Sequence, residues 1–274
     1  MPNFTPSTTL TRSDASKYLA TNTKLPHYVD AIGNEAFQRR NQIQTVSFPP
    51  ELSRIGARAF QGCAFLKKIE LPATVTELGN AAFSDCSAMK SAVLPATPLT
   101  LPREFMSGNR RLETVTFQGR SHLTNIYPNA FSECQSLGSL LLPSTVTEIH
   151  DRAFYRCKSL DQVYFPPGLR VIGIQAFYFC GFRTIELPDT LEALDESAFF
   201  KCTNLTHVRL PKSVRYIGKW AFHGCNRLQY VEFRHDPDFI GPWIINRATT
   251  IRCYRGSKVD QYCQENGFKV EYWD

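Results

Sequence analysis

The chain has 274 residues, of which 43% are hydrophobic and 20% are charged, and its formal net charge at pH 7 is +6. This is an ordinary globular composition with enough apolar residues for a large core. The mild positive charge permits acidic partners, but no dense Lys/Arg run makes nucleic acid a necessary one. No apolar stretch reaches the length of a signal peptide or a membrane span. These features predict a soluble, cytoplasmic protein, with the cell surface as the alternative.

The first segment, residues 1–24, is expected to be an N-terminal cap. Ser13-Asp14-Ala15-Ser16-Lys17-Tyr18-Leu19 reads as a short capped helix, and Tyr18 and Leu19 would cover the open end of the first turn. A first strand follows near residues 22–25. The solenoid proper is expected over residues 25–234.

One dipeptide, Ala-Phe, returns along the chain at a nearly fixed interval. Phe105 keeps this rhythm with Glu104 in place of Ala. The interval is about 22–23 residues at every step except the one from Phe105 to Phe131, which is longer by three. A period of this size predicts stacked repeats around one continuous core. The copies stand at Ala36-Phe37, Ala59-Phe60, Ala82-Phe83, Ala130-Phe131, Ala153-Phe154, Ala176-Phe177, Ala198-Phe199 and Ala221-Phe222.

Each repeat places other apolar residues around this dipeptide in a fixed order. Residues 55–78 and 149–172 both read I-x-x-x-A-F-x-x-C-x-x-L-x-x-h-x-h-P-x-x-h-x-x-h, where h is apolar. The h-x-h-P part predicts a strand that stops at the proline, which lacks an amide donor, and the next apolar pair turns the chain back. The predicted strands are Val46–Phe48, Ile69–Leu71, Ala92–Leu94, Val115–Phe117, Leu140–Leu142, Val163–Phe165, Ile185–Leu187, Val208–Leu210 and Val231–Phe233.

One repeat, residues 95–131, departs from this pattern. Pro98-Leu99-Thr100-Leu101-Pro102 replaces the Ile-Gly turn, Gly108 takes the cysteine position, and Gln118 follows the strand in place of proline. Three extra residues are expected near 118–125. Insertions in repeat proteins map to loops and often to binding surfaces, although loops also tolerate them without function. The basic residues of this repeat are Arg103, Arg110, Arg111, Arg120 and His122.

The last segment, residues 235–274, is expected to be a C-terminal cap. Ser257 is a candidate helix N-cap and Gly267 a candidate residue just past the helix end. The helix between them would close the stack, with Trp243, Ile244 and Ile245 beneath it.

The combination of a Leu-x-x-Ile-x-Leu-Pro strand, an Ile-Gly-x-x-Ala-Phe turn and a Cys three places after the Phe resembles the BspA-type leucine-rich repeat family. The resemblance runs from about Leu25 to the C-terminus, where residues 249–273 look like the family's closing strand, turn and helix. It implies an α/β repeat protein: a right-handed, strand-rich leucine-rich-repeat solenoid with a parallel sheet on one face and terminal caps. It also implies protein binding, often at microbial cell surfaces, and no enzymatic activity.

Cysteine is the residue most open to a chemical role. Adjacent turns lie about 5 Å apart, so the geometry alone permits disulfides between ladder positions. One small apolar position repeated in a row favours a reduced structural ladder instead. No Cys-x-x-Cys pair, phosphate loop or His-x-x-x-His motif is present, so we expect no metal and no cofactor. The ladder is Cys63, Cys86, Cys134, Cys157, Cys180, Cys202 and Cys225, with Cys253 and Cys263 in the cap.

Alternation along the strands predicts which side chains face outward. The central row has an apolar middle and a charged end, which is typical of a contact site, although β propensity alone also explains Val, Leu and Tyr in strands. This row is Ser47, Glu70, Val93, Thr116, Leu141, Tyr164, Glu186, Arg209 and Glu232. The residues two positions earlier are expected to point inward or sideways: Thr45, Lys68, Ser91, Thr114, Ser139, Gln162, Thr184, His207 and Tyr230.

We therefore predict a non-catalytic protein-binding or scaffold module with an unidentified protein partner and no small-molecule substrate. Nucleic acid is disfavoured, because the Arg clusters carry no interleaved aromatics. The alternatives are a cell-surface or secreted adhesin, a structural subunit of a large assembly, and a hydrolase that uses one cysteine. The predicted contact residues are Val93, Thr116, Leu141, Tyr164, Glu186, Arg209 and Glu232 on the strands, and Arg103, Arg120 and His122 in the irregular repeat.

Overall fold

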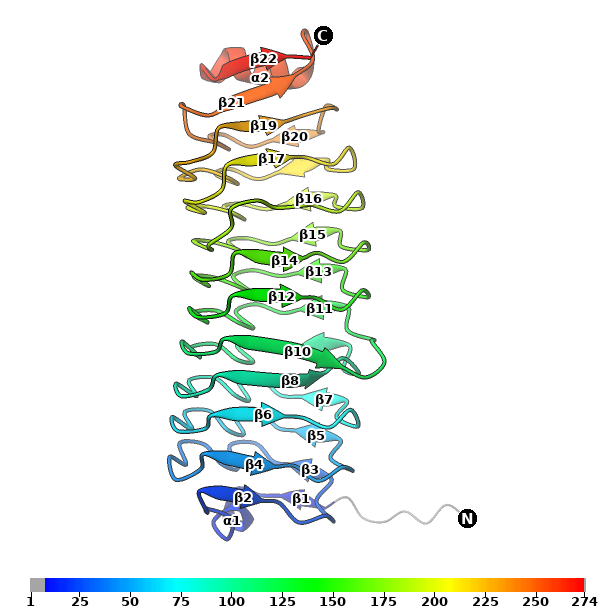
Figure 1. Ribbon diagram of the computed structural model, residues 1–274. Coiled ribbons are helices and arrows are strands. Elements are labelled where there is room, and N and C mark those ends of the chain that lie inside the picture. Colours follow the sequence, from blue (N-terminus) through cyan, green and yellow to red (C-terminus); the bar gives the residue numbers. More distant parts are fainter. Residues whose placement is uncertain (1–7, 274) are drawn as a thin grey trace, which may run out of the picture.

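The structure, a computed structural model, describes residues 8–273 and is a solenoid with two parallel-stranded faces (Figure 1). Nearly every turn adds one longer strand to the face that we call the main sheet and one two-residue strand to the short-strand sheet behind it. All strand pairs are parallel, as stacked turns require. The solenoid fold that the sequence predicts is confirmed.

The main sheet is drawn in front in Figure 1 and falls into three hydrogen-bonded segments, β2 to β10, β12 to β14, and β17 to β22. Its strands are β2 (Asn22–Lys24), β4 (Thr45–Ser47), β6 (Lys68–Glu70), β8 (Ser91–Pro95), β10 (Thr114–Gln118), β12 (Ser139–Leu141), β14 (Gln162–Tyr164), β17 (His207–Arg209), β19 (Tyr230–Glu232), β21 (Thr250–Cys253) and β22 (Lys269–Tyr272).

The short-strand sheet was not predicted, because its two-residue strands come from the apolar pairs that were expected only to turn the chain back. It breaks once, between β7 and β9. Its strands are β1 (Thr9–Leu10), β3 (Ala31–Ile32), β5 (Arg54–Ile55), β7 (Glu77–Leu78), β9 (Thr100–Leu101), β11 (Asn125–Ile126), β13 (Glu148–Ile149), β15 (Val171–Ile172), β16 (Ala193–Leu194), β18 (Tyr216–Ile217) and β20 (Phe239–Ile240).

Eight of the nine predicted main strands are present, and each begins one residue earlier than predicted. The ninth, Ile185–Leu187, is not a strand. Its turn is one residue short, because Phe182 reaches the core two places after Cys180, whereas Leu160 does so three places after Cys157. The amide of Thr206 still donates to Arg183 O at 3.1 Å just before this segment, but residues 185–187 form no ladder with β14 or β17.

The irregular repeat has a different register from the one that the sequence suggested. The amide of Phe83 donates to the carbonyl of Phe105 at 2.9 Å, just as the amide of Phe60 donates to that of Ala82 at 2.8 Å. Phe105 therefore occupies the Ala position and Met106 the Phe position. The expected alignment of Phe105 with Phe, and of Gly108 with Cys, was wrong. The turn that follows is longer by two residues, not three.

Phenylalanine rings form the centre of the core. The rings of Phe37, Phe60 and Phe83 are stacked with centroids 4.9 and 5.1 Å apart. A second stack runs through Phe131, Phe154, Phe177, Phe199 and Phe222, with centroids 5.1–5.5 Å apart. All are fully buried, and burial of each ring contributes about 2–3 kcal/mol. Between the stacks Phe105 meets Phe83 edge-on at 88°, and Met106 interrupts the row of rings.

The cysteine ladder runs beside the rings, and each thiol is bonded to the turn before it. Cys63 Sγ donates to the carbonyl of Phe37 at 3.0 Å, and Cys86 Sγ donates to that of Phe60 at 3.2 Å. The other five ladder thiols repeat this bond at 3.2–3.3 Å. In the irregular repeat the position is held by Asn109, whose Nδ2 donates to Phe83 O at 3.0 Å.

Both ends of the solenoid are capped by a helix. The helix α1 (Arg12–Ala15) begins at Thr11, which forms a capping box with Asp14, so it starts earlier and is shorter than predicted. Tyr18 and Leu19 pack against the core as expected. The helix α2 (Lys258–Asn266) confirms Ser257 as its N-cap and Gly267, at φ 67°, as its C-cap. Residues 1–7 of the predicted N-terminal segment lie outside the described residues.

We predict that Asn109→Cys stabilises the protein. Asn109 is fully buried, and its Oδ1 has no hydrogen-bond partner within residues 8–273. Such a buried unpaired oxygen costs about 1–3 kcal/mol, part of which the weaker thiol bond to Phe83 O offsets. A net gain of about 1 kcal/mol should raise the Tm by about 2–4 °C in thermal unfolding followed by circular dichroism.

Asn109→Ala is the control for this substitution. It removes the unpaired oxygen but also removes the donor to Phe83 and leaves a cavity, so its Tm should fall. An Asn109→Cys variant that is no more stable than the unsubstituted protein would contradict the place of position 109 in the ladder.

Candidate protein-interaction surface

The strand register aligns the predicted contact residues across the main sheet. Glu70 lies opposite Val93 and Val93 opposite Thr116; further along, Leu141 lies opposite Tyr164. Arg209 lies opposite Glu232 in the last segment. None of these side chains is buried. Glu186 is also exposed but lies in the stretch that forms no strand.

The row two positions earlier also faces outward, and the expectation that it would point inward or sideways was wrong. The three-residue strands β6, β12, β14 and β17 each have two exposed ends around one buried centre, as a side-chain period of two requires. The core residue of each strand is therefore its middle one, such as Ile69 or Leu140. The outer face of the main sheet is thus two residues wide.

An apolar groove lies where the main sheet is interrupted between β10 and β12. The interruption follows from the long turn, because β10 stays paired with β8 as far as Gln118 opposite Pro95, and the extra residues then carry the chain away. Leu141 stands in this groove with 69% of its surface exposed, more than any other large hydrophobic residue described. We call it the central groove; its volume is about 460 Å³, and it is lined by Ala96, Val115, Thr116, Phe117, Gly119, Ser121, Leu141, Leu142, Pro143 and Ser144.

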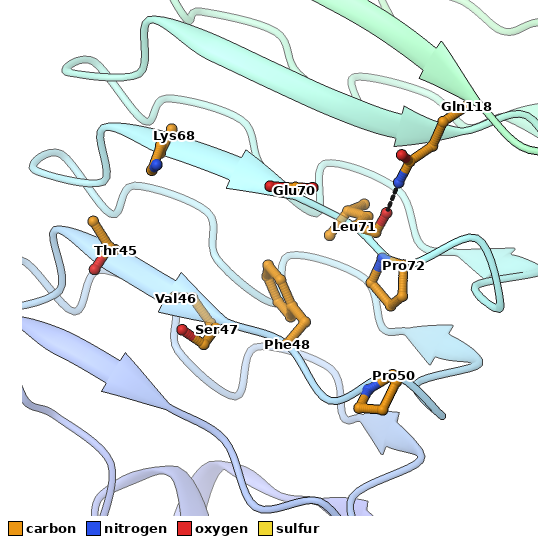
Figure 2. A pocket seen from close by; sticks show the side chains of 10 residues that line it. All are labelled: Thr45, Val46, Ser47, Phe48, Pro50, Lys68, Glu70, Leu71, Pro72 and Gln118. Atoms are coloured by element: carbon orange, nitrogen blue, oxygen red, sulfur yellow. Dashed lines mark hydrogen bonds between the residues drawn. The ribbon is translucent and has the colours of Figure 1, made fainter.

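A second, more polar groove lies over β4 and β6, and Figure 2 shows the side chains around it. Gln118 closes one end of it, where its Nε2 donates to the carbonyl of Leu71 at 2.7 Å across two turns. Lys68, Glu70 and Phe48 also line it. Because Gln118 takes the place of a proline, it can continue the strand and bind the earlier turn.

The charged end of the main sheet is partly paired within the protein. Arg252 of β21 contacts Glu232 at 3.3 Å and Glu271 at 2.9 Å, and its guanidinium lies 3.9 Å from the ring centroid of Tyr230. The hydrogen bond with Glu271 raises the pKa of Arg252. Glu232 is therefore held by a neighbour, whereas Arg209 forms no ion pair within residues 8–273.

The irregular repeat does not bring its three predicted contact residues together. Arg120 and His122 lie in the loop between β10 and β11, the bulge on the right of Figure 1. Gly119 opens this loop at φ 85°, which favours glycine, and the amide of His122 donates to Ala96 O at 2.7 Å. Arg103 follows β9 and lies at the other edge of the solenoid. Arg120 and His122 thus flank the central groove, and Arg103 does not.

The buried thiols are poor candidates for chemistry. Burial raises the pKa of Cys63 to about 11 and that of Cys134 and Cys263 to about 12. It raises the pKa of Cys86, Cys157 and Cys202 well above the ordinary value. A thiol acts as a nucleophile or metal ligand only as the thiolate, which burial here disfavours. Within the described part of the chain, no three His, Cys, Asp or Glu side chains gather as metal ligands would.

The sequence matches the family model described as the BspA type leucine-rich repeat region, with 6 copies over residues 15–138 and 124–252. The chain therefore belongs to the BspA-type leucine-rich repeat family, as its repeat motifs predicted. No curated protein matches it at the level of sequence.

Crystal structures of other leucine-rich repeat proteins are similar to this chain. One from Bacteroides ovatus is 22% identical with a TM-score of 0.59, over 92% of this chain and 84% of that one. The pneumococcal vaccine antigen PcpA is 18% identical with a TM-score of 0.44, over 93% and 79%. A leucine-rich cell surface protein from Faecalibacterium prausnitzii is 21% identical with a TM-score of 0.40, over 92% and 79%. In residues 8–273 of the present chain, no helix has the length and apolar character needed to cross a membrane.

We predict that the cysteines are unpaired and slow to react. Iodoacetamide at neutral pH should modify the folded protein slowly, because burial keeps the thiols protonated. After unfolding without a reductant, mass spectrometry should show one added group on each of the nine cysteines, since all nine are free. Groups missing in pairs would reveal disulfides, and one fast-reacting thiol in the folded protein would indicate a nucleophile.

Proposed function

We propose that this protein is a non-catalytic protein-interaction module that binds its partner through the outer face of the main sheet, centred on the central groove. The observation that carries the proposal is the exposure of Leu141 in an apolar groove, beside Tyr164 with 53% of its surface exposed. A soluble protein rarely leaves adjacent large apolar side chains in contact with water unless they meet a partner.

The groove suits an apolar side chain of a partner protein. Phe117, Leu142 and Pro143 supply apolar walls, and Thr116 and Ser121 supply hydroxyls at the edge. Burying one such anchor contributes about 1.5–3 kcal/mol, which is the size of an interface hot spot. Arg120 and His122 on the adjacent loop, and Val93 and Thr116 on the neighbouring strands, would form the rim.

The absence of catalysis is part of the proposal and is supported by the side chains present. The seven ladder thiols are buried and hydrogen-bonded to carbonyls. Among the described residues, His150 contacts Glu148 at 3.4 Å and His207 contacts the Thr206 hydroxyl at 3.1 Å, but these are separate pairs and do not form a nucleophile–base–acid triad. Membership of a leucine-rich repeat family also favours a binding scaffold. We therefore propose no substrate and no cofactor.

We further propose that the protein works inside the cell, with attachment to the cell surface as the alternative. Seven thiols donate to core carbonyls, and oxidation would remove these bonds and force neighbouring turns into disulfide geometry. A reducing compartment preserves the ladder.

We predict that the double variant Leu141→Ser/Tyr164→Ser loses its partner without losing its fold. Both side chains are exposed, so the Tm should shift by less than about 2 °C, whereas recovery of the partner from native lysate should fall about tenfold or more. Affinity purification of both forms, with quantitative mass spectrometry, measures this.

The matched control is Ile174→Ser/Tyr216→Ser, which removes one aliphatic and one aromatic side chain that are 40% and 42% exposed, away from the main sheet. It should leave recovery unchanged. If the Leu141→Ser/Tyr164→Ser variant recovered the partner as well as the unsubstituted protein does, the main sheet would not be the binding surface.

A localisation experiment tests the compartment separately. A tagged copy expressed in the source cells should resist protease added to intact cells and become sensitive only after lysis. Cleavage on intact cells would show that the protein is exposed at the cell surface and would favour the adhesin alternative.

A further inference from the structure

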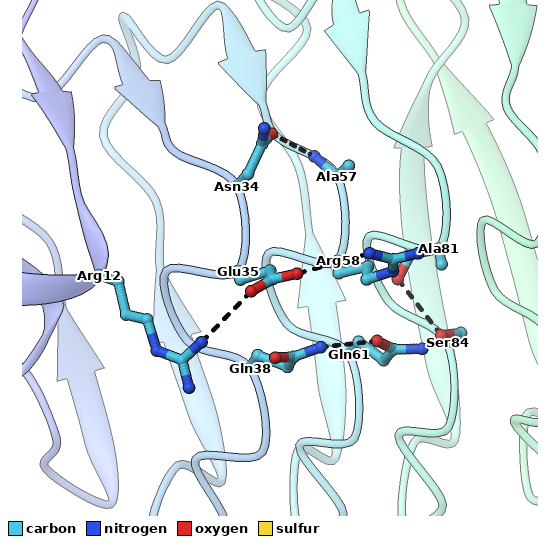
Figure 3. A network of polar contacts seen from close by, with 9 residues as sticks. All are labelled: Arg12, Asn34, Glu35, Gln38, Ala57, Arg58, Gln61, Ala81 and Ser84. Atoms are coloured by element: carbon cyan, nitrogen blue, oxygen red, sulfur yellow. Dashed lines mark hydrogen bonds and ion pairs between the residues drawn. The ribbon is translucent and has the colours of Figure 1, made fainter.

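The Ala-Phe turns form the edge of the solenoid on the left of Figure 1. The side chains on this edge change from polar to aromatic about halfway along the chain. The residue that follows each core Phe, or Met106 in the irregular repeat, lies on this edge. In the first five such turns these residues are polar, and Figure 3 shows the bond from Gln38 Nε2 to Gln61 Oε1 at 2.8 Å. In the next four they are Tyr155, Tyr178, Phe200 and His223.

These four rings form a continuous half-buried stack, which we call the aromatic ladder. Their centroids are 4.8, 5.2 and 5.8 Å apart, and neighbouring planes differ by 12–24°. The ring faces are therefore turned toward each other, and the exposed part of this half-buried row consists of ring edges. Because the edge of an aromatic ring carries the positive part of its quadrupole, this row favours negative charge.

Cations flank the same ladder. The guanidinium carbons of Arg152 and Arg156 lie 5.8 and 5.9 Å from the ring centroid of Tyr155, and Lys201 Nζ lies 5.6 Å from that of Phe200. Lys158 Nζ lies 5.5 Å from the ring of Phe179, next to Tyr178 in the chain.

Only part of this charge is neutralised inside the protein. Arg156 pairs with Glu133 at 3.3 Å, while Arg152 donates to the neutral Gln175 at 2.8 Å. Among the described residues, no carboxylate forms an ion pair with Arg152, Lys158 or Lys201. The earlier turns differ, because Glu35 there pairs with both Arg12 and Arg58 (Figure 3).

We propose that the aromatic ladder and its cations form a second binding surface, separate from the main sheet, for an acidic α-helical segment of a partner protein. The rings repeat every 4.8–5.8 Å, and the pitch of an α-helix, about 5.4 Å, is close to this spacing. A helix lying along the solenoid axis therefore places carboxylates at i, i+4 and i+7 opposite successive turns. About ten residues of helix match the roughly 15 Å length of the ladder.

Other anionic partners fit less well. Alternate residues of an extended strand lie about 6.6 Å apart and lose register with the turns after two or three repeats. Single-stranded nucleic acid binds aromatic platforms by stacking bases on ring faces, and here those faces already contact each other.

A labelled, alanine-rich peptide of about 18 residues, with Glu at i, i+4 and i+7 along one face, is the probe. Fluorescence anisotropy with the full chain should show saturable binding that weakens as salt rises. An isomeric peptide with the same Glu residues spread around the helix should bind at least about threefold more weakly. Lys158→Gln/Lys201→Gln should reduce affinity for the first peptide about fivefold.

Lys24→Gln/Lys67→Gln is the matched control, because it removes two exposed charges of the other half of the chain. It should leave the affinity within about twofold, and Leu141→Ser/Tyr164→Ser should do the same, which separates this surface from the central groove. The proposal would be overturned if the two isomeric peptides bound equally, or if both lysine double variants lost the same affinity. It would also be overturned if heparin or a single-stranded oligonucleotide bound more tightly than the peptide.

Discussion

Backbone hydrogen bonds between successive turns are the constraint on which this structure depends. The amide of Phe154, for example, donates to Ala176 O, and the amide of Gly173 donates to Ile149 O, both at 2.8 Å. Donor and acceptor stand one repeat apart, so every turn must return the chain to the same place after about 23 residues. The stacked rings, the thiol bonds and the two sheets are all aligned by this return.

The central groove and the missing ninth strand both lie where a turn departs from that length. Two extra residues before Phe131 interrupt the main sheet after β10 and open the apolar groove beside Leu141. One residue fewer after Cys180 removes a strand and leaves Glu186 outside the sheet. Core positions cannot vary without loss of packing, so a regular solenoid of this kind gains individual surfaces through changes in turn length and through side chains that face outward.

The sequence predicted the fold well because the repeated letters report directly on the core. The Ala-Phe and Cys positions, Ser257 and Gly267 all lie where the pattern placed them. Phe105 was misplaced because its identity matched the consensus Phe, whereas the backbone register assigns that role to Met106. The short strands were missed because two residues carry too little alternation to be recognised in a sequence.

The candidate surfaces were less predictable, because they depend on how neighbouring turns meet. The row of outward residues could be read from period-two alternation, yet the groove beside Leu141 depends on the gap between two strands. Gln118 was visible as the missing proline, but its bond to Leu71 crosses two turns and has no sequence signal. The stacking of Tyr155 on Tyr178 likewise requires the rotamers and spacing of the folded chain.

The interruption of the phenylalanine stacks at Phe105 and Met106 bears on how the molecule comes apart. The short-strand sheet breaks between β7 and β9, where Phe83 meets Phe105, and the main sheet breaks two turns later, between β10 and β12. Repeat proteins hold together through nearest-neighbour contacts, and a weak interface divides them into separate cooperative units. Each of the two interfaces keeps one of its sheets, because β6 pairs with β8 across the first and β11 pairs with β13 across the second. The solenoid is therefore weakened at two places rather than divided along one line, and the central groove lies at the second.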